Sequence, residues 1–187
     1  MSKHRPTTPS LAASSYPNFT PHITLASFPS DTTIAALRES IPFDQSVVPV
    51  QFSSLLSGET YTRSVYVTVK LSPALASLHA EIHSALKAEP RTPSFPHMSL
   101  FYIADKDAEV RERERVTREI MESSVVLNPK DRGSGITLDC KGTGADPSGQ
   151  TKLDGFTGSE IWIVRCEGLV EEWQILEKIM LASMTKD

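Results

Sequence analysis

The sequence predicts an α+β fold made of two related halves. One short pattern, Pro-His-apolar-hydroxyl-Leu, occurs at residues 21–25 and again at 96–100, so its two histidines lie 75 positions apart (97 − 22). Each half also contains a stretch with the periodicity of an amphipathic helix and stretches with the alternation of strands. No linker of changed composition separates the halves. These observations predict a duplicated, pseudo-two-fold unit within one chain of 187 residues.

The chain is predicted to begin with a segment that does not fold. Residues 1–17 are rich in Ser, Thr and Pro, a composition with little apolar surface to bury. Residues 18–187 are then the single bilobal domain. Along its first part, alternation, capping residues and turn residues predict, in order, a strand over 22–28, a helix over 32–40 capped by Ser30 or Asp31, a strand over 47–56, a turn at Gly58-Glu59 and a strand over 63–70.

The second part begins with the clearest helix signal of the chain. Ser72 is a good N-cap, Pro73 suits the first helical position, and Leu75, Leu78 and Ile82 recur at helical spacing. Further along, the patterns predict a strand over 97–103, a charged helix over 105–122 with ion pairs Glu109–Arg113 and Glu114–Arg118, a strand over 136–140, a glycine-rich loop over 142–149, a strand over 158–166 and a closing helix over 171–180.

Composition limits the partners that this chain can have. The net charge is −4, which gives no general attraction to a polyanion, so no long nucleic acid is expected and a small phosphorylated ligand is the easier partner. No apolar run reaches membrane-spanning length, and no apolar segment follows the basic residues near the N-terminus, so we expect no membrane insertion and an intracellular, cytoplasmic monomer.

The two repeated motifs carry the chemistry. On a strand, side chains alternate between faces, so His22 and Thr24 point to one side, and His97 and Ser99 do the same in the second copy. Two imidazoles can serve as general acid and general base, and hydroxyls can donate hydrogen bonds to anionic oxygens. This set suits phosphoryl transfer with no metal, no cofactor and no covalent nucleophile.

The paired His-x-(Ser/Thr) motifs resemble those of the 2H phosphoesterase superfamily, and the residues around them are most similar to its 2',3'-cyclic-nucleotide 3'-phosphodiesterase branch of fungal type. The similarity is carried by residues 19–25, 62–67, 95–102 and 160–164, in the order expected of that branch. The resemblance implies the bilobal 2H fold, in which two pseudo-two-fold-related antiparallel sheets line a central cleft with helices outside.

The resemblance also implies an activity. The enzyme would open nucleoside 2',3'-cyclic phosphates to 2'-phosphates, and would act on ADP-ribose 1'',2''-cyclic phosphate, a by-product of tRNA splicing. We assign His97 as base and His22 as acid, although the sequence is symmetric and the reverse stays open. Thr24 and Ser99 would bind the non-bridging phosphate oxygens. Family likeness alone suggests Golgi association.

Two aromatic residues are further candidates for substrate binding, each with an alternative. Tyr102 stands five residues after His97, as an aromatic does in plant relatives, but strict alternation would place it on the opposite face unless a bulge or strand end intervenes. Trp162 lies in the region from which an aromatic stacks on the base in plant relatives. For both residues the alternative is a core aromatic.

Other interpretations of the sequence remain open. The enzyme alternative is an RNA-end processing 2H phosphodiesterase or ligase on longer RNA, and the binding alternative is a nucleotide-binding module without catalysis. His79 and His83 stand at i and i+4 on one helix, a spacing that can ligate a metal, but no third ligand accompanies them. We therefore interpret them as flank histidines of an amphipathic helix.

Overall fold

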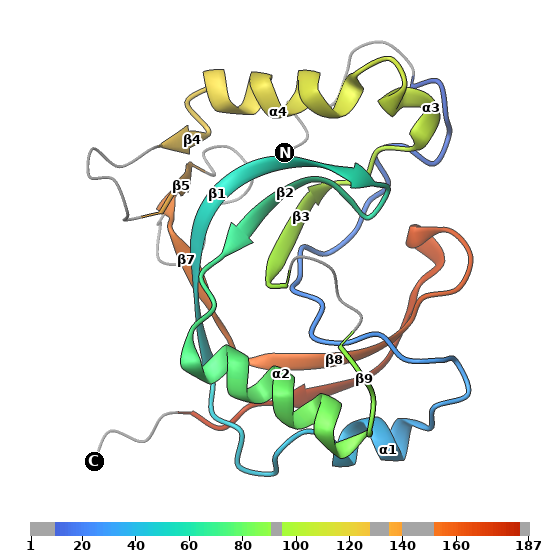
Figure 1. The fold of residues 1–187 in the computed structure, drawn as a ribbon, viewed down its shortest axis with the longest axis vertical. Helices are drawn as coiled ribbons and strands as arrows, with labels where there is room; N and C mark the ends of the chain where they lie inside the picture. Colours follow the sequence, from blue (N-terminus) through green and yellow to red (C-terminus); the bar gives the residue numbers. More distant parts are fainter. Residues whose placement is uncertain (1–9, 91–94, 128–134, 140–151, 184–187) are drawn as a thin grey trace. The chain divides into compact units, whose positions relative to one another are not determined.

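A computed structural model describes residues 10–90, 95–127, 135–139 and 152–183, and it confirms the predicted α+β class (Figure 1). Its helices are α1 (Ile34–Glu39), α2 (Pro73–Ala85), α3 (Asp105–Ala108) and α4 (Glu112–Glu122). Its strands are β1 (Val48–Thr60), β2 (Arg63–Val69), β3 (His97–Phe101), β4 (Val126–Leu127), β5 (Thr137–Asp139), β6 (Lys152–Leu153), β7 (Gly155–Gly158), β8 (Glu160–Arg165) and β9 (Gln174–Met180).

The described strands form three sheets rather than the two that were expected. The orders are β3-β2-β1-β7, β4-β5-β6 and β8-β9, and the registered pairs within them are antiparallel. The chain divides into two compact units, the first comprising residues 1–23, 51–70 and 97–155, and the second 24–50, 71–96 and 156–187. Each unit therefore draws on three separated parts of the sequence.

The first unit is built around β2, whose side chains are almost all buried. Val65 and Val67 have no exposed surface, and the strand pairs with β1 on one side and β3 on the other. The predicted strand over 63–70 is thus confirmed, because β-branched residues suit a strand covered on both faces. On α4, Val116 and Ile120 are fully buried and supply the apolar face of this helix.

The turn between β1 and β2 lies later than predicted. Gly58 belongs to β1, which runs on to Thr60, and the turn is at Tyr61-Thr62. The register slips between Ser57 and Thr60, and a Cβ placed on Gly58 would lie 2.2 Å from the Arg63 carbonyl oxygen. Gly58 is therefore required by the close approach of a neighbouring strand at an irregularity, and not by a turn.

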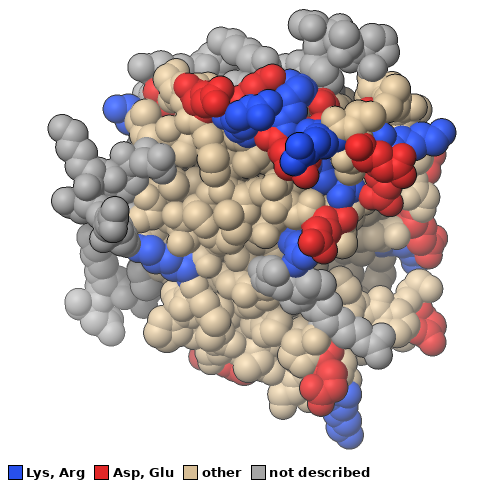
Figure 2. Space-filling model, turned by 45° about the horizontal axis from the view of Figure 1, so that its top comes forward, with Lys and Arg blue, Asp and Glu red and all other residues tan. Residues whose placement is uncertain are grey.

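The predicted helix over 105–122 is interrupted. Arg111, with φ of 64°, separates α3 from α4, and the expected pair Glu109–Arg113 does not form. Arg113 is buried and donates instead to the carbonyl oxygens of Ile103 and Glu59 and to Asp105. Arg115 pairs with Glu112 and Glu119. Figure 2 shows basic and acidic groups gathered together on one face of the molecule, so that face carries no patch of a single sign.

Part of the segment predicted to be disordered has defined contacts. The Asp107 carboxylate accepts hydrogen bonds from the Leu11 and Ala12 amides at 2.7 and 3.0 Å and from the Ser15 hydroxyl at 2.7 Å. Ser15 and Tyr16 are buried, and Tyr16 donates its amide to the Tyr102 carbonyl. The structure therefore places residues 10–16 against the first unit, while residues 1–9 lie outside the described residues.

The second unit contains α1, α2 and the β8–β9 hairpin. Ser72 caps α2 by accepting from the Leu75 amide, as predicted, and Leu75, Leu78 and Ile82 are buried. Helix α1 is capped by Thr33 rather than by Ser30 or Asp31. The Arg38 guanidinium on α1 binds the Glu177 carboxylate on β9 at 2.7 Å. No helix among the described residues is both long and apolar enough to cross a membrane.

The closing helix predicted over 171–180 is wrong, because only a short 3-10 helix forms at Val170–Glu172 and residues 174–180 are strand β9. It pairs with β8 from Glu160↔Met180 to Arg165↔Gln174. The predicted strand over 158–166 is confirmed as β8. Leu176 and Met180 are four residues apart, a spacing that places two side chains on one face of a helix and also on one face of a strand, and hairpin pairing decided between the two structures. The glycine-rich loop over 142–149 lies outside the described residues.

Candidate active site

The first histidine motif does not form the strand predicted over 22–28. In its place a single antiparallel bridge joins Ile23 to Met98, which lies on β3 between His97 and Ser99. Continuing that register by one residue sets His22 across from Ser99 and makes His97 its diagonal neighbour, an arrangement with a Cα separation of about 7–8 Å. Residues on either side of a bridged pair point to its opposite face. Alternation about the bridge therefore predicts that His22, His97 and Ser99 share one face of the first unit.

The His22 imidazole has a defined hydrogen bond. Its Nδ1 lies 2.7 Å from the carbonyl oxygen of Thr20. A carbonyl can only accept, so Nδ1 carries the proton and donates. The other ring nitrogen, Nε2, is then the one that accepts a proton when the ring is neutral and donates when it is charged. His22 is half-buried, so part of its ring can contact a ligand while the hydrogen bond at Nδ1 holds the ring in place.

His97 is held differently, within β3 and beside an aromatic ring. It pairs with Thr68 on β2, and its ring meets that of Tyr66 edge to face, at 5.4 Å between centroids and 71° between planes. The Arg63 guanidinium carbon lies 5.8 Å from the centroid of the same Tyr66 ring. This arrangement brings an imidazole, a buried tyrosine and a positive charge into one cluster, which is a favourable setting for an anionic ligand.

Ser99 is buried and its hydroxyl is already bonded. The Oγ donates to the carbonyl oxygen of Thr62 at 2.6 Å. A hydroxyl has one proton, so the predicted hydrogen bond to a phosphate oxygen requires this proton to rotate away from Thr62. Its position beside the histidines agrees with the predicted role, and the role itself stays a prediction.

Tyr102 lies just beyond β3 and is only 3% exposed. The β2–β3 register slips so that Leu100 has no partner between Ser99 and Phe101, and such an irregularity turns the following residues to the other face. The Tyr102 ring stacks on Phe19 at 4.2 Å and 3°, and Phe19 in turn meets the His22 ring at 6.4 Å and 81°. This burial favours the core alternative for Tyr102, and its contact with substrate stays a prediction.

Thr24 and Trp162 belong to the second unit. Thr24 is half-buried, directly after the last residue of the first unit. Trp162 is half-buried on β8, where its indole nitrogen donates to Glu160 at 2.6 Å and the Lys178 ammonium lies 4.1 Å from the ring centroid. The cation covers one face of the indole, which is a stable arrangement for an aromatic ring at a strand surface.

Sequence reasoning missed the residues that support the histidines. Phe19, Arg63 and Tyr66 all lie in the stretches that carry the family resemblance, yet no role was predicted for any of them. Tyr66 could have been found, because it lies in a strand that the sequence predicts. The β2–β3 register then sets it beside Ser99. For Phe19 there was no such signal, since its contacts depend on an irregular segment.

The other histidine pair lies in the second unit and is more buried than expected for flank residues. His83 is 4% exposed, its ring is 4.5 Å from that of His79, and Phe95 stacks on His79 at 4.1 Å. Burial, and then the neighbouring His83, lower the pKa of His79. In the part of the chain that the structure describes, no three His, Cys, Asp or Glu residues are grouped closely enough to hold a metal.

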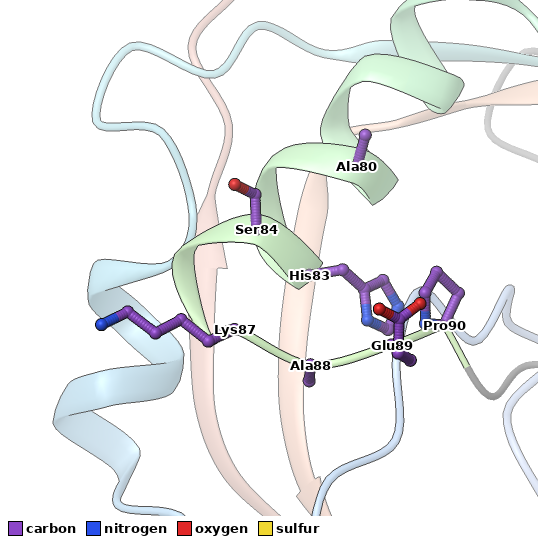
Figure 3. Close-up of a pocket in the computed structure, with 7 residues that line it drawn as sticks. All are labelled: Ala80, His83, Ser84, Lys87, Ala88, Glu89 and Pro90. Carbon is purple, nitrogen blue, oxygen red and sulfur yellow. The ribbon is translucent and has the colours of Figure 1, made fainter.

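A pocket of about 450 Å³ opens beside this pair at the end of α2 (Figure 3). Figure 3 shows the Lys87 side chain extending away from His83. None of the predicted substrate residues lines the pocket, which is formed by Ala80, His83, Ser84, Lys87, Ala88, Glu89 and Pro90. The pocket therefore gives no support to a substrate site in this place.

The α+β architecture with antiparallel sheets and paired His-x-(Ser/Thr) motifs is that of a 2H phosphoesterase. A family model described as cyclic phosphodiesterase-like protein matches residues 6–181, which is most of the chain. The chain belongs to this family, and the family supports a hydrolase with cyclic phosphodiesterase activity. Among curated proteins, none matches the sequence.

Proposed function

We propose that the protein hydrolyses nucleoside 2',3'-cyclic phosphates to nucleoside 2'-phosphates by two-histidine general acid–base catalysis. ADP-ribose 1'',2''-cyclic phosphate is a second proposed substrate, since it carries the same strained cyclic diester. The observation that supports the proposal is the bridge between Ile23 and Met98, because alternation about a bridged pair predicts that His22 and His97 share one face of the first unit. Two imidazoles on one face can act on the attacking and departing oxygens of the same phosphorus.

The proposed step begins with water attacking phosphorus in line with the 3' oxygen. His97 accepts the proton of that water, and His22 donates a proton from Nε2 to the departing 3' oxygen, so the P–O3' bond breaks as the new P–O bond forms. The hydrogen bond from Nδ1 to the Thr20 carbonyl supports the acid role, because it fixes the ring and leaves Nε2 as the nitrogen that can pass a proton to the substrate.

The remaining proposed contacts stabilise the phosphate and the base. Ser99 and Thr24 bind the non-bridging oxygens, where negative charge is held in the transition state. The nearby guanidinium of Arg63, over the Tyr66 ring that touches His97, favours an anion at this place. Trp162 stacks on the nucleobase, with its indole held by Glu160 and Lys178.

The test is phosphorus NMR of a 2',3'-cyclic mononucleotide incubated with the protein in excess EDTA, together with His22→Ala and His97→Ala. We expect a 2'-phosphate from the wild type and a loss of about 10²–10⁴-fold in each variant, because each removes one proton transfer. Far-UV circular dichroism confirms that the variants are folded.

Other products would identify other functions. A 3'-phosphate would keep the histidines but contradict the proposed regiochemistry. Turnover of a 2',3'-cyclic-ended oligonucleotide in preference to the mononucleotide would favour the RNA-end alternative. No turnover by folded protein that still binds a 2'-nucleotide would make the chain a binding module.

A further inference from the structure

Phe19 connects His22 to the core of the first unit. Its side chain is half-buried, three residues before the histidine, and its ring meets the imidazole at 81° with 6.4 Å between centroids. An edge-to-face pair of this kind prefers one relative orientation. The imidazole also donates a hydrogen bond from Nδ1 to the Thr20 carbonyl. Together these two contacts fix both the direction of the ring and the nitrogen that carries the proton.

Phe19 is itself held in place by a stacked aromatic ring. The ring of Tyr102 lies parallel to it, at 4.2 Å and 3°, and Tyr102 contacts Tyr61 at 5.5 Å between centroids. The Tyr61 hydroxyl donates to the Ser14 carbonyl at 2.7 Å. Because Tyr102 is 3% exposed and follows β3 directly, this stack joins the segment before His22 to the strand that carries His97.

We propose that Phe19 is a positioning residue for the acid histidine, and that Tyr102 acts through it as the ring on which Phe19 rests. The stack holds His22 in the tautomer with the proton on Nδ1 and presents Nε2 toward the reacting phosphate. This inference rests on the proposed function for its effect on rate, but the orientation and tautomer of His22 are properties of the unliganded protein.

The physical reason is the weak local structure around His22. The residues before and after it form no strand, and the bridge at Ile23 is isolated. A histidine in such a segment can rotate about its side-chain bonds, and the neutral ring can shift its proton to Nε2. In that tautomer Nε2 already carries the proton of the neutral ring, so it cannot take up the additional proton that the acid donates in the next turnover. A rotated ring no longer points Nε2 at the leaving oxygen. Small misplacement of a catalytic group costs about 10²-fold in rate.

The experiment compares Phe19→Leu with Phe19→Tyr, using kinetics with a cyclic mononucleotide and nitrogen NMR of the His22 ring. Leu keeps apolar volume but removes the ring, so we expect kcat to fall about 10- to 100-fold with KM changed less than about 2-fold. Tyr keeps the ring and restores kcat. Phe156→Leu, at an exposed position on β7 in the second unit, is the matched control.

The NMR measurement separates positioning from a merely structural role. The wild type is expected to show the protonated nitrogen of neutral His22 at Nδ1, and Phe19→Leu a mixture of both tautomers. Tyr102→Phe, which keeps the ring beneath Phe19, retains the wild-type tautomer, whereas Tyr102→Leu gives the mixture. Urea unfolding of each variant shows how much of any change follows from stability.

Either measurement can overturn the inference. Wild-type kcat in Phe19→Leu, or an unchanged His22 tautomer in both Leu variants, would show that the stack does not position His22. If the wild type hydrolyses no cyclic phosphate, the proposed function fails, but the tautomer measurement still decides whether Phe19 and Tyr102 orient the ring.

Discussion

Asp107 offers the sharpest test of how the N-terminal segment is held, because its carboxylate binds a stretch that composition predicted to be unfolded. The carboxylate is 4% exposed and accepts three hydrogen bonds, from the Leu11 and Ala12 amides and the Ser15 hydroxyl, at 2.7, 3.0 and 2.7 Å. Asp107→Ala removes all three hydrogen bonds at once. The segment from residue 10 to Tyr16 then loses the side chain that fastens it to α3.

The magnitude follows from these contacts. A hydrogen bond to a charged group contributes about 1.5–3 kcal/mol, so three independent bonds would exceed 4 kcal/mol. Leu11 is exposed and Ala12 is half-exposed, so both amides regain water once the carboxylate is gone. The Ser15 hydroxyl is buried and keeps one further partner, since it accepts from the Ala104 amide at 2.9 Å. We therefore expect a loss of about 2–4 kcal/mol in the free energy of unfolding.

The assay is urea unfolding followed by far-UV circular dichroism, with Asp44→Ala as the control. Asp44 is an exposed aspartate outside the helices and strands, and its removal is expected to cost less than about 0.5 kcal/mol. A loss below about 0.5 kcal/mol in Asp107→Ala would refute the reasoning, as would an equal loss in the control. Amide exchange at Leu11 and Ala12 should accelerate in the Asp107 variant alone.

Three further outcomes are expected. Burial lowers the pKa of His79 from 6.5, so the unfolded state binds a proton at a higher pH than the folded state. The free energy of unfolding should therefore decrease as pH falls below about 6.5. Urea unfolding at pH 7.5 and pH 5 should show a smaller decrease for His79→Phe than for the wild type. Gly58→Ala should lower stability by more than about 1 kcal/mol, measured in the same way, because the new Cβ meets the Arg63 carbonyl at 2.2 Å. Trp162→Leu should weaken binding of a 2'-nucleotide, measured by calorimetry, by about 1–3 kcal/mol if the indole stacks on the base, and unchanged affinity would leave Trp162 as a structural aromatic.

The elements that the sequence predicted well are those with a local cause. Helix α2 begins at Pro73 because Ser72 can cap it and because Pro there needs no amide partner, and both causes lie within a few residues. Strand β2 is likewise a run of β-branched residues that is buried on both faces. The errors have distant causes. Segment 174–180 is a strand because β8 pairs with it, and Gly58 lies within a strand because the backbone of Arg63 comes close.

The candidate site also contains features with local causes, which could be predicted, and features with distant causes, which could not. The chemistry of His22, His97 and Ser99 could be predicted from two short motifs, because residue type and alternation are enough to propose two imidazoles and a hydroxyl on one face. The support that Phe19 gives to His22 could not be predicted. Phe19 reaches His22 from an irregular segment and rests on Tyr102, a residue more than 80 positions away (102 − 19).

The two motifs are nearly identical in sequence, and the structure makes them unequal. His97 lies in a strand that pairs with β2, and its ring meets Tyr66, beneath the guanidinium of Arg63. His22 lies outside any strand and donates a hydrogen bond from Nδ1 to the backbone carbonyl of Thr20. The Nδ1 contact leaves Nε2 as the nitrogen through which His22 can pass a proton to a ligand, which supports the acid role proposed for it. The two copies of the motif therefore need not play the same part in the proposed reaction.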